Sequence, residues 1–489
     1  MGTRSNPSKP AITILGIPFD NVTTPEVIDI VEEMIESGKP HYIATANVDF
    51  VAQSHRDLEL RQILFDAHLV VCDGMPLVWA SKFLGNPLQE RVAGSDLTPL
   101  LLKLASEKSY RVYVLGGRED IAQKALENAK RDYPGLVIAG AYSPPRADLL
   151  EMDHDGIIER IREAKPDILF VAFGCPKQEK WLSMHWREAQ APVGIGVGAS
   201  IDFLSGEIKR APVWMQRTGL EWLFRMLQEP KRLFRRYFID LVVFVPAIFH
   251  QWRMLRVKKR PKKAEDFSPS DSTSIIDDFP VFALPKRIDI SLIREQPDML
   301  GIPALGGPSV VLDASKTDFI DSSGIGFLVK LAKTARADLG EICLVKPSPA
   351  IVDALALMKL TEFFPTATSP EEAAETLTTR IRERKATAVG SSDSDSPYTL
   401  TGELTAANTR IVWPELEALV KARGAHGGGQ LAVDLHSLRF LDSSGLGILI
   451  KLKKAASAEN VTLRYLNPSD PVLNVLEVTG TRAFLLGDG

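Results

Sequence analysis

The stretch Phe319–Gly340 reads FIDSSGIGFLVKLAKTARADLG, and about 120 residues later Phe440–Val461 reads FLDSSGLGILIKLKKAASAENV. In both copies a hydrophobic strand leads into Asp-Ser-Ser-Gly, an amphipathic helix follows, and a second strand and helix come next. The strands are predicted at Ser309–Ser315, Glu341–Ser348, Gln430–Phe440 and Val461–Ser469, and the second helices at Ala350–Leu357 and Pro471–Thr479. The repeat therefore predicts two small α/β domains, one for each copy.

The repeated turn is suited to starting a helix. Asp321 and Ser322 in the first copy, and Asp442 and Ser443 in the second, can cap it through side-chain oxygens. The next serine of each copy, Ser323 or Ser444, falls in the first helical turn. Free backbone amides and the helix dipole favour a phosphate group there.

Composition and length set the limits for the rest of the chain. The 489 residues suggest about three domains, and 45% hydrophobic with 25% charged residues is ordinary for a soluble globular protein. A net charge of −4 gives no reason to expect a nucleic-acid partner. Three cysteines (Cys72, Cys175, Cys343) match no metal or disulfide spacing, which favours a reducing compartment. The polar start, Met1–Pro10, predicts no signal peptide.

Two polar stretches divide the chain. Residues 258–275 are first basic, then acidic and Ser-rich, and residues 385–397 are rich in Gly, Ser and Asp. Neither stretch can bury enough apolar surface to offset its ordering entropy, so both are predicted to be linkers. The predicted domains are therefore residues 10–257, 276–384 and 398–489.

The N-terminal domain alternates buried strands with amphipathic helices. Strands are predicted at His41–Asn47, His68–Gly74, Arg111–Gly117, Asp167–Gly174 and Pro192–Gly198, with helices such as Pro25–Ser37 and Asp120–Asp132 between them. This alternation predicts βαβ units and a parallel sheet. Ligands of such sheets bind beyond the carboxyl ends of the strands.

Polar side chains gather at those strand ends. Thr45 and Asn47 close one strand, Asp73 closes the next, and Gln178 follows a third. The loop RVAGSD supplies Arg91 and Asp96. Each has a purely structural alternative: an Asp before Gly, for example, often bonds only the local backbone of a turn. Their shared location at one edge of the sheet favours a site.

The domain ends in a basic segment. Residues 229–263 hold Lys231, Arg232, Arg235 and Arg236, then the apolar run Phe238–Phe249, then further cations. The run is interrupted by Asp240 and Pro246 and is too short to span a bilayer. The segment is either a basic helix packed on the domain or an element that lies on a membrane surface.

The N-terminal domain resembles the WecG/TagA/CpsF glycosyltransferases (glycosyltransferase family 26) over about Ile12–Trp252. The resemblance rests on seven motifs in order: TANVDFV, DGMPLVWASKFLG, RVAGSDL, VYVLGG, FGCPKQEKWL, GVGASIDFLSGEIKRAP and GLEWLFRMLQEPKRLFRRY. It implies a Rossmann-like parallel-sheet domain with a basic helical appendage. It also implies inverting, metal-independent transfer of an N-acetylmannosamine-type or related hexose from a UDP-sugar to a polyprenyl-diphosphate-linked sugar at the cytoplasmic membrane face.

The resemblance also implies roles for particular residues. Asp73 would be the general base that takes the proton of the acceptor hydroxyl. Thr45 and Asn47 match the family's pocket. The departing UDP needs donors or cations, for which Arg91, Gln178 and the glycine turns Gly116–Gly117 and Gly196–Gly198 are candidates. Arg232, Arg235 and Arg236 fit the appendage arginines that complete the family's active site over the acceptor.

The two repeats resemble STAS domains, the anti-sigma-factor-antagonist fold, over about Pro280–Thr378 and Tyr398–Leu486. The resemblance implies phosphorylation of Ser323 and Ser444 by a partner serine kinase, which would disrupt docking of a partner surface. The alternative is that the serines only cap helices and the domains act as docking modules. The start of the first repeat, ALPKRIDISLIREQPDML, fits the pattern less well than that of the second.

Together these patterns predict a UDP-sugar-dependent glycosyltransferase for exopolysaccharide, capsule or wall polymer. We expect it to be cytoplasmic, peripheral on the inner face of the membrane and able to form a homo-oligomer, with two STAS-like regulatory modules. One alternative is a regulatory scaffold with an inactive transferase domain, against which the intact Asp73, Thr45 and Asn47 argue. Another is a soluble UDP-sugar epimerase, which would need a nicotinamide cofactor and a GxGxxG strand–helix turn that the sequence lacks.

Overall fold

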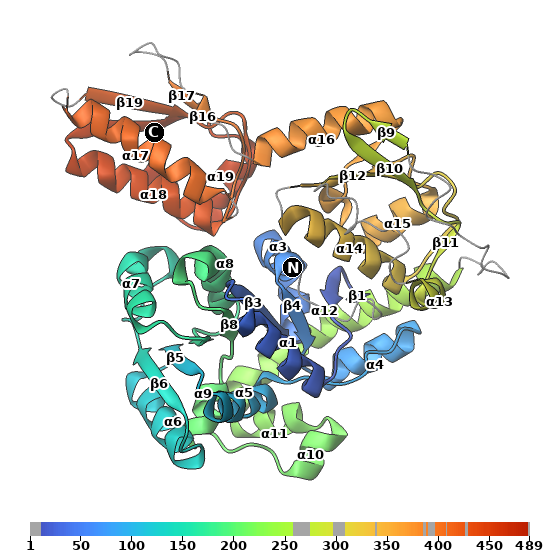
Figure 1. The fold of residues 1–489 in the computed structure, drawn as a ribbon, viewed down its shortest axis with the longest axis vertical. Helices are drawn as coiled ribbons and strands as arrows, with labels where there is room; N and C mark the ends of the chain where they lie inside the picture. The colour runs from blue at the N-terminus through green and yellow to red at the C-terminus, as the bar shows by residue number, and fades with distance from the viewer. Residues whose placement is uncertain are drawn as a thin grey trace. The chain divides into compact units, whose positions relative to one another are not determined.

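The computed structural model describes residues 11–257, 274–296, 309–337, 340–384, 388–389, 397–406, 408–425 and 429–487. Its contacts divide the chain into two compact units (Figure 1). The first unit holds the chain up to Thr334 together with Ile342–Pro370, and the second holds Ala335–Glu341 and the chain from Glu371 onward. The N-terminal domain and most of the first repeat therefore belong to one unit.

The N-terminal domain is built on a six-stranded parallel sheet with the order β4-β3-β8-β7-β5-β6. All five predicted strands are confirmed. A sixth, β6, occupies one edge and was missed, because it is only partly buried and lacks a continuous apolar run. The strands are β3 (His41–Ala46), β4 (Leu69–Cys72), β5 (Arg111–Gly116), β6 (Val137–Tyr142), β7 (Ile168–Ala172) and β8 (Val193–Gly196).

Helices cover both faces of this sheet (Figure 1). Successive residues of a strand point to opposite faces, so Tyr42 and Ala44 enter one core and Ile43 enters the other. On the Ile43 side of the sheet, the core is formed with helices α1 (Thr24–Glu36), α5 (Gly94–Lys108), α6 (Glu119–Asp132) and α9 (Ser200–Ser205). The core of Tyr42 contains α2 (Val48–Ser54), α3 (Leu58–Asp66), α4 (Met75–Leu84), α7 (His154–Ala164), α8 (Lys177–Ala189) and the hairpin β1 (Ile12–Ile14)–β2 (Ile17–Phe19).

The basic segment forms part of one long helix. After a 3-10 turn at Leu149–Glu151 and the short helices α10 (Val213–Thr218) and α11 (Glu221–Gln228), α12 runs from Pro230 to Val257. The predicted apolar run Phe238–Phe249 lies within this longer helix, because Pro246 does not end it. Among the described residues, Leu233–Leu255 is the one stretch long and apolar enough to cross a membrane.

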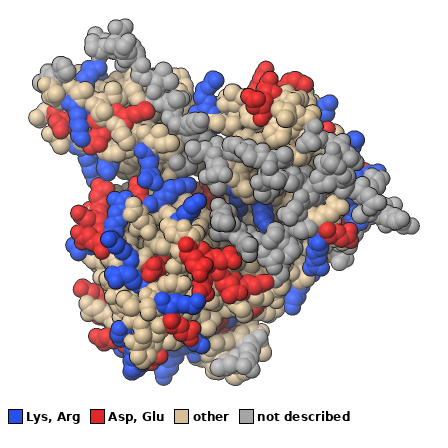
Figure 2. All heavy atoms as spheres, viewed as in Figure 1, with Lys and Arg blue, Asp and Glu red and all other residues tan. Residues whose placement is uncertain are grey.

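The two faces of α12 reverse the usual pattern of a surface helix. Its buried face includes the polar residues Asp240 and Gln251, together with Leu233, Phe244 and Ile248. Its exposed face carries large apolar side chains: Phe234, Phe238, Ile239, Leu241, Val242, Val245 and Phe249. Elsewhere, acidic and basic side chains are interspersed on the visible face of the N-terminal domain, as the small net charge predicts (Figure 2).

Each repeat forms the predicted small α/β domain. In the first, β9 (Ser274–Ile276), β10 (Phe279–Ala283), β12 (Val310–Asp313), β14 (Ile342–Val345) and β15 (Thr366–Ala367) form one sheet, and β11 (Arg287–Ile288) pairs with β13 (Phe319–Ile320). Its helices are α13 (Ile290–Glu295), α14 (Ser322–Ala337), α15 (Pro349–Leu357), the 3-10 turn Thr361–Phe363 and α16 (Pro370–Arg384).

The second repeat follows the same order. β16 (Ala388–Val389), β17 (Tyr398–Leu400), β19 (Gly429–Asp434) and β21 (Val461–Leu466) form one sheet, and β18 (Gly402–Leu404) pairs with β20 (Leu438–Leu441). Its helices are α17 (Thr409–Ala425), α18 (Ser443–Ala458), α19 (Asp470–Val478) and α20 (Arg482–Leu486). The prediction of one strand over Gln430–Phe440 is wrong, because the chain divides there into β19 and β20, which join different sheets. The predicted linkers lie mostly outside the described residues.

Candidate active site

Asp73 lies directly beyond the carboxyl end of β4. Its backbone nitrogen donates to Ala46 O (2.9 Å) of the neighbouring strand, and its Oδ2 accepts from the backbone nitrogen of Gly94 (3.2 Å) at the start of α5. Gly74 follows with a φ of +156°, which favours glycine and turns the chain sharply into α4. The half-buried carboxylate is thus fixed at the strand ends where ligands of such sheets bind.

The surroundings of Asp73 raise its pKa to about 6. Burial is the largest cause, and the nearby Glu221 acts in the same direction. Arg91, the Gly94 amide and Arg225 oppose the shift but do not cancel it. A carboxyl group with such a pKa is ionised at neutral pH and basic enough to accept a proton in catalysis.

A network of two arginines and two carboxylates borders Asp73. Arg91 pairs with Asp96 (Nη2–Oδ2, 2.5 Å) and with Glu221 (Nη1–Oε2, 3.0 Å). Arg210 reaches the same two acids at 2.7 Å and 3.3 Å. Burial disfavours the charge on Arg91, but Glu221 and Asp96 outweigh it and raise its pKa. The network ties α5 and α11 together.

Sequence reasoning missed three members of this region. Arg210, Glu221 and Arg225 all lie in the motifs GVGASIDFLSGEIKRAP and GLEWLFRMLQEPKRLFRRY, more than a hundred residues after Asp73. Arg225, on α11, is near enough to Asp73 to lower its pKa, and its guanidinium lies 5.4 Å from the centre of the Phe203 ring. The charged residues of these motifs were visible in the sequence, but no pattern indicated that they lie near Asp73.

Thr45, Asn47 and Gln178 lie at the same sheet edge and are partly occupied by structural bonds. Thr45 Oγ1 donates to Gly196 O (3.0 Å), and Asn47 Oδ1 caps α2 by accepting from the amides of Asp49 (3.0 Å) and Phe50 (3.4 Å). Gln178 is buried, and its Oε1 accepts from the amides of Gly174 and Gly198 (both 3.1 Å). It therefore joins two loops beyond the ends of β7 and β8.

The glycine turns are also engaged within the protein. The Gly117 amide donates to Ala172 O (3.0 Å), and the Gly198 amide is the one held by Gln178. These two donors point to protein acceptors. Both amides are thus already engaged within the protein.

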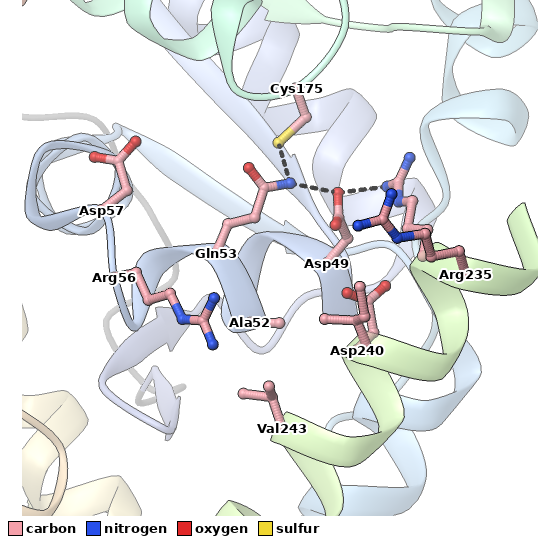
Figure 3. A pocket seen from close by; sticks show the side chains of 11 residues that line it. Asp49, Ala52, Gln53, Arg56, Asp57, Cys175, Arg235, Asp240 and Val243 are labelled. Carbon is pink, nitrogen blue, oxygen red and sulfur yellow. Dashed lines mark hydrogen bonds and ion pairs between the residues drawn. The ribbon is translucent and has the colours of Figure 1, made fainter. Parts of the chain in front are cut away.

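A hollow lies between α2, the β7–α8 turn and α12, with a volume of about 610 Å³ (Figure 3). Arg235 and Arg236 of α12 line it together with Asp49, Gln53 and Cys175. Gln53 Nε2 donates to Asp49 Oδ2 (2.8 Å), and Arg236 Nη2 pairs with the same carboxylate (2.5 Å). Arg235 is exposed at the rim, whereas the side chain of Arg232 is outside the described part of the structure.

Asp49 and Asp240 form a carboxyl pair at the base of this hollow. Burial, together with the Asp49 charge and a hydrogen bond with Asp49, raises the pKa of Asp240 to about 7, although Arg236 opposes the shift. Two carboxylates in contact cannot both ionise cheaply, so Asp240 holds its proton to higher pH than an exposed aspartate does. Neighbouring Glu179 is also buried, and burial raises its pKa to about 8.

Asn47 connects the two regions. A Cβ atom on Gly74, next to Asp73, would lie 3.9 Å from Asn47 Cβ, and Asn47 begins the helix that carries Asp49. The structure thus brings Asp73, Thr45, Asn47, Arg91 and Gln178 to one sheet edge, with Arg235 and Arg236 one helix further on. Among the described residues, no group of three His, Cys, Asp or Glu side chains is arranged to hold a metal ion.

The two candidate phosphorylation sites lie far from this edge in sequence. Asp321 Oδ1 accepts from the amides of Ser323 (2.8 Å) and Gly324 (2.9 Å), and Asp442 Oδ1 accepts from Gly445 (2.8 Å), so both aspartates cap their helices as predicted. Ser323 has no exposed surface and Ser444 is 7% exposed. Both candidate serines are thus buried.

Comparison with known proteins agrees with this geometry. Residues 12–258 match the model described as Glycosyl transferase WecG/TagA/CpsF family, and the chain belongs to that family. Its N-terminal domain is therefore a glycosyltransferase domain. Residues 275–373 match a STAS domain, and residues 387–487 match the model described as Mlab, STAS domain.

Two relatives share the name N-acetylglucosaminyldiphosphoundecaprenol N-acetyl-beta-D-mannosaminyltransferase. The chain is 33% identical over 234 residues to the one from Bacillus spizizenii, covering 48% of this chain and 88% of the relative. It is 29% identical over 264 residues to one from Staphylococcus aureus, covering 54% of this chain and 98% of the relative. The similarity covers nearly the whole of these relatives but only about half of this chain.

Proposed function

We propose that the protein transfers an N-acetylmannosamine-type or related hexose from a UDP-sugar to a polyprenyl-diphosphate-linked acceptor in the assembly of a wall or surface polymer. The observation that carries the proposal is the Asp73 carboxylate at the strand ends of a WecG/TagA/CpsF domain, with arginines beside it. The names of the relatives support a lipid-linked acceptor and an N-acetylmannosamine donor sugar.

Asp73 would act as the general base of an inverting displacement. The acceptor hydroxyl attacks the anomeric carbon, its proton passes to Asp73, and the bond from that carbon to the diphosphate oxygen breaks with the electron pair leaving on UDP. The Gly94 amide, which donates to Oδ2, holds the carboxylate in place. A pKa of about 6 keeps the group ionised at neutral pH.

The arginines around Asp73 would stabilise the leaving diphosphate. Arg91 and Arg225 both act on the charge of Asp73, which places positive charge at this edge of the sheet. Oriented cations stabilise charge that develops in a transition state. We expect transfer to proceed without a divalent metal, so that activity persists in excess chelator.

Helix α12 would hold the enzyme against the inner face of the cytoplasmic membrane. Its exposed face carries Phe238 (59% exposed), Leu241 (59%) and Phe249 (54%). Exposure of these apolar side chains to water is unfavourable, and contact with lipid would remove it. The cations Arg235 and Arg236 lie at its N-terminal part, where they can meet anionic headgroups or the acceptor diphosphate. This arrangement supports a peripheral location at a surface that holds the lipid carrier.

The two STAS domains would act as regulatory or docking modules. Ser323 and Ser444 lie in the first turn of α14 and α18 and are buried, so this turn would have to open before a kinase could add a phosphate that changes the charge of a partner-binding surface. A serine kinase or another STAS-binding protein would then be the partner.

The test is transfer of labelled sugar from a panel of UDP-sugars to a short-chain polyprenyl-diphosphate acceptor, with and without chelator. Asp73→Asn should keep UDP binding and lose about 10²–10⁴-fold in rate, which is the usual contribution of a general base. Asp132→Asn, an exposed change on α6, serves as the control. Transfer by the Asp73 variant at the wild-type rate would remove Asp73 as the base. No transfer and no UDP binding by the wild type would favour a scaffold with an inactive domain.

A further inference from the structure

The first STAS domain packs against the transferase domain through the start of helix α14. Asn86, just after α4, donates from Nδ2 to Ser322 Oγ (2.6 Å). Burial raises the pKa of Asp321, and a hydrogen bond with the Asn86 side chain opposes that rise. Ala11 lies against Gly326, where a Cβ atom would meet Ala11 O at 2.0 Å. The Asp-Ser-Ser-Gly-Ile-Gly segment is thus a contact surface.

A second set of contacts comes from the turn after α15. Arg61, on α3, has no exposed surface and donates from Nη1 to the backbone oxygens of Met358 (2.7 Å) and Lys359 (3.4 Å). Phe65, one turn further along α3, stacks near Phe363 with ring centres 4.7 Å apart and lies 6.3 Å from Phe364. Buried arginine and aromatic anchors of this kind are typical of tight interfaces.

The second repeat provides an internal comparison. Its sequence aligns with the first at a constant offset of 121 residues between Asp321 and Asp442, and Lys359 and Gly480 both adopt a positive φ at the matching turn. Met358 is 1% exposed, but the matching Thr479 is exposed. Phe363 is 6% exposed, but the matching Phe484 is 48% exposed.

The helix starts differ in the same way. Ser322 and Gly326 are buried, whereas the matching Ser443 and Gly447 are half-buried. The STAS fold by itself therefore leaves this surface open, and the transferase domain closes it in the first copy. Ser323 Oγ is enclosed there without a hydrogen-bond partner among the described residues.

We propose that the transferase domain is the resident partner of the first STAS domain, which docks on it in the same chain through the Asp-Ser-Ser-Gly surface of α14 and the turn after α15. Asn86, Arg61 and Phe65 form the receiving surface. Because the two domains share one chain, their effective concentration is high, and any other partner of the first copy must displace the transferase. Among the described residues, the matching positions Ser443, Thr479 and Phe484 of the second copy are more exposed than those of the first. This inference does not depend on which sugar is transferred.

The test is hydrogen exchange on the full-length chain. Gly326→Ala places a methyl group against Ala11 O, although the same change in a helix interior ordinarily favours the helix itself. The expected result is at least about tenfold faster exchange of amides in α3 and around Asn86, with α14 still protected. Gly447→Ala, the matched change in the second repeat, should leave α3 unchanged.

A second variant tests the transferase side of the contact. Asn86→Asp sets a carboxylate against Asp321 and Ser322 and should give the same loss of protection in α3. Wild-type exchange in α3 for both Gly326→Ala and Asn86→Asp would overturn the proposal. Faster exchange of α3 in Gly447→Ala alone would also overturn it, because the second copy would then be the docked one. Loss of protection in α14 itself would show unfolding of the domain and would count against docking as the cause.

Discussion

Asp73 is held between opposing influences. Burial and Glu221 favour its protonated form, while Arg91, Arg225 and the Gly94 amide favour the carboxylate. The balance leaves a pKa of about 6, above the ordinary value of 3.8. The group can therefore be ionised when the acceptor arrives and still be a better base than an exposed aspartate.

We expect a pH dependence of transfer that follows this carboxyl group. Since the deprotonated form is the base, kcat/KM should rise about tenfold per pH unit below pH 6 and level off above about pH 7. Arg91→Gln removes a group that lowers the pKa of Asp73, so the midpoint should move to higher pH. Rates measured from pH 5 to 8 check both statements. A flat profile, or a midpoint that moves down in the Arg91 variant, would contradict them.

At the residue scale, the sequence predicted which residues lie at the sheet edge better than it predicted their ion pairs and hydrogen bonds. Asp73, Thr45, Asn47, Arg91 and Gln178 do gather at the strand ends, because parallel strands bring their carboxyl ends to one edge. Their partners could not be predicted, since Arg210, Glu221 and Arg225 come from α11 and the loop before it. Packing of distant elements decides such pairings, and single-sequence patterns carry little information about it.

Among the elements, α12 ties the Asp49 region of the candidate site to the β1–β2 hairpin. Its buried face places Asp240 on Asp49 of α2, and Gln251 donates to Thr13 O (3.2 Å) and accepts from the Leu15 amide (3.0 Å) of the β1–β2 hairpin. Its opposite face is apolar and exposed. The sequence showed the apolar run and the cations, but Asp240 and Pro246 seemed to interrupt a helix that tertiary contacts in fact sustain.

The Asp49–Asp240 pair should make stability depend on pH. In the folded state Asp240 keeps its proton up to about pH 7, whereas in the unfolded chain it loses it near pH 4, so the folded state binds more protons in between. The free energy of unfolding should therefore fall as pH rises from 4 to 7, by at most about 4 kcal/mol. Asp240→Asn, which stays neutral, should lose this part of the dependence, and exposed Asp132→Asn should retain it. Urea unfolding at pH 5 and 8 measures this dependence. An equal change in unfolding free energy between the two pH values in all three proteins would refute the raised pKa of Asp240.

The exposed face of α12 should govern membrane binding. Phe238→Glu removes a large apolar side chain and adds a negative charge, so binding to vesicles with anionic lipid should weaken about tenfold or more. Val478→Glu changes a side chain that is 88% exposed in the second STAS domain and should have little effect. Vesicle sedimentation compares the two; equal loss in both variants would mean that general charge, rather than α12, sets the binding.

For the whole molecule, the sequence showed three folded parts but not that two of them are joined. The contact of Arg61 with Met358 links residues 297 positions apart, and no periodicity or motif predicts such a pair. The Asp-Ser-Ser-Gly turns look alike in the two copies, so their different burial comes only from what packs against them. Repetition in sequence thus does not imply equivalence in structure.

Truncation should show whether the first STAS domain stabilises the transferase domain. A chain ending at Val257 exposes Phe65 and Arg61, which the first STAS domain covers, and should unfold about 4–10 °C lower than a chain ending at Arg384. The longer chain lacks only the second repeat and should keep the full-length midpoint for its transferase domain. Equal midpoints for the two truncated chains, read by differential scanning calorimetry, would show that the transferase domain does not rely on its neighbour.

The apolar face of α12 has a kinetic consequence. A helix of 28 residues is about 42 Å long, and if its exposed apolar face lies flat on the bilayer, the exposed Arg235 stands near headgroup depth. Encounters with the lipid acceptor then occur in two dimensions, by lateral diffusion. The rate would follow the mole fraction of acceptor in the membrane, so adding inert lipid at constant total acceptor would slow the enzyme as dilution slows a reaction in solution.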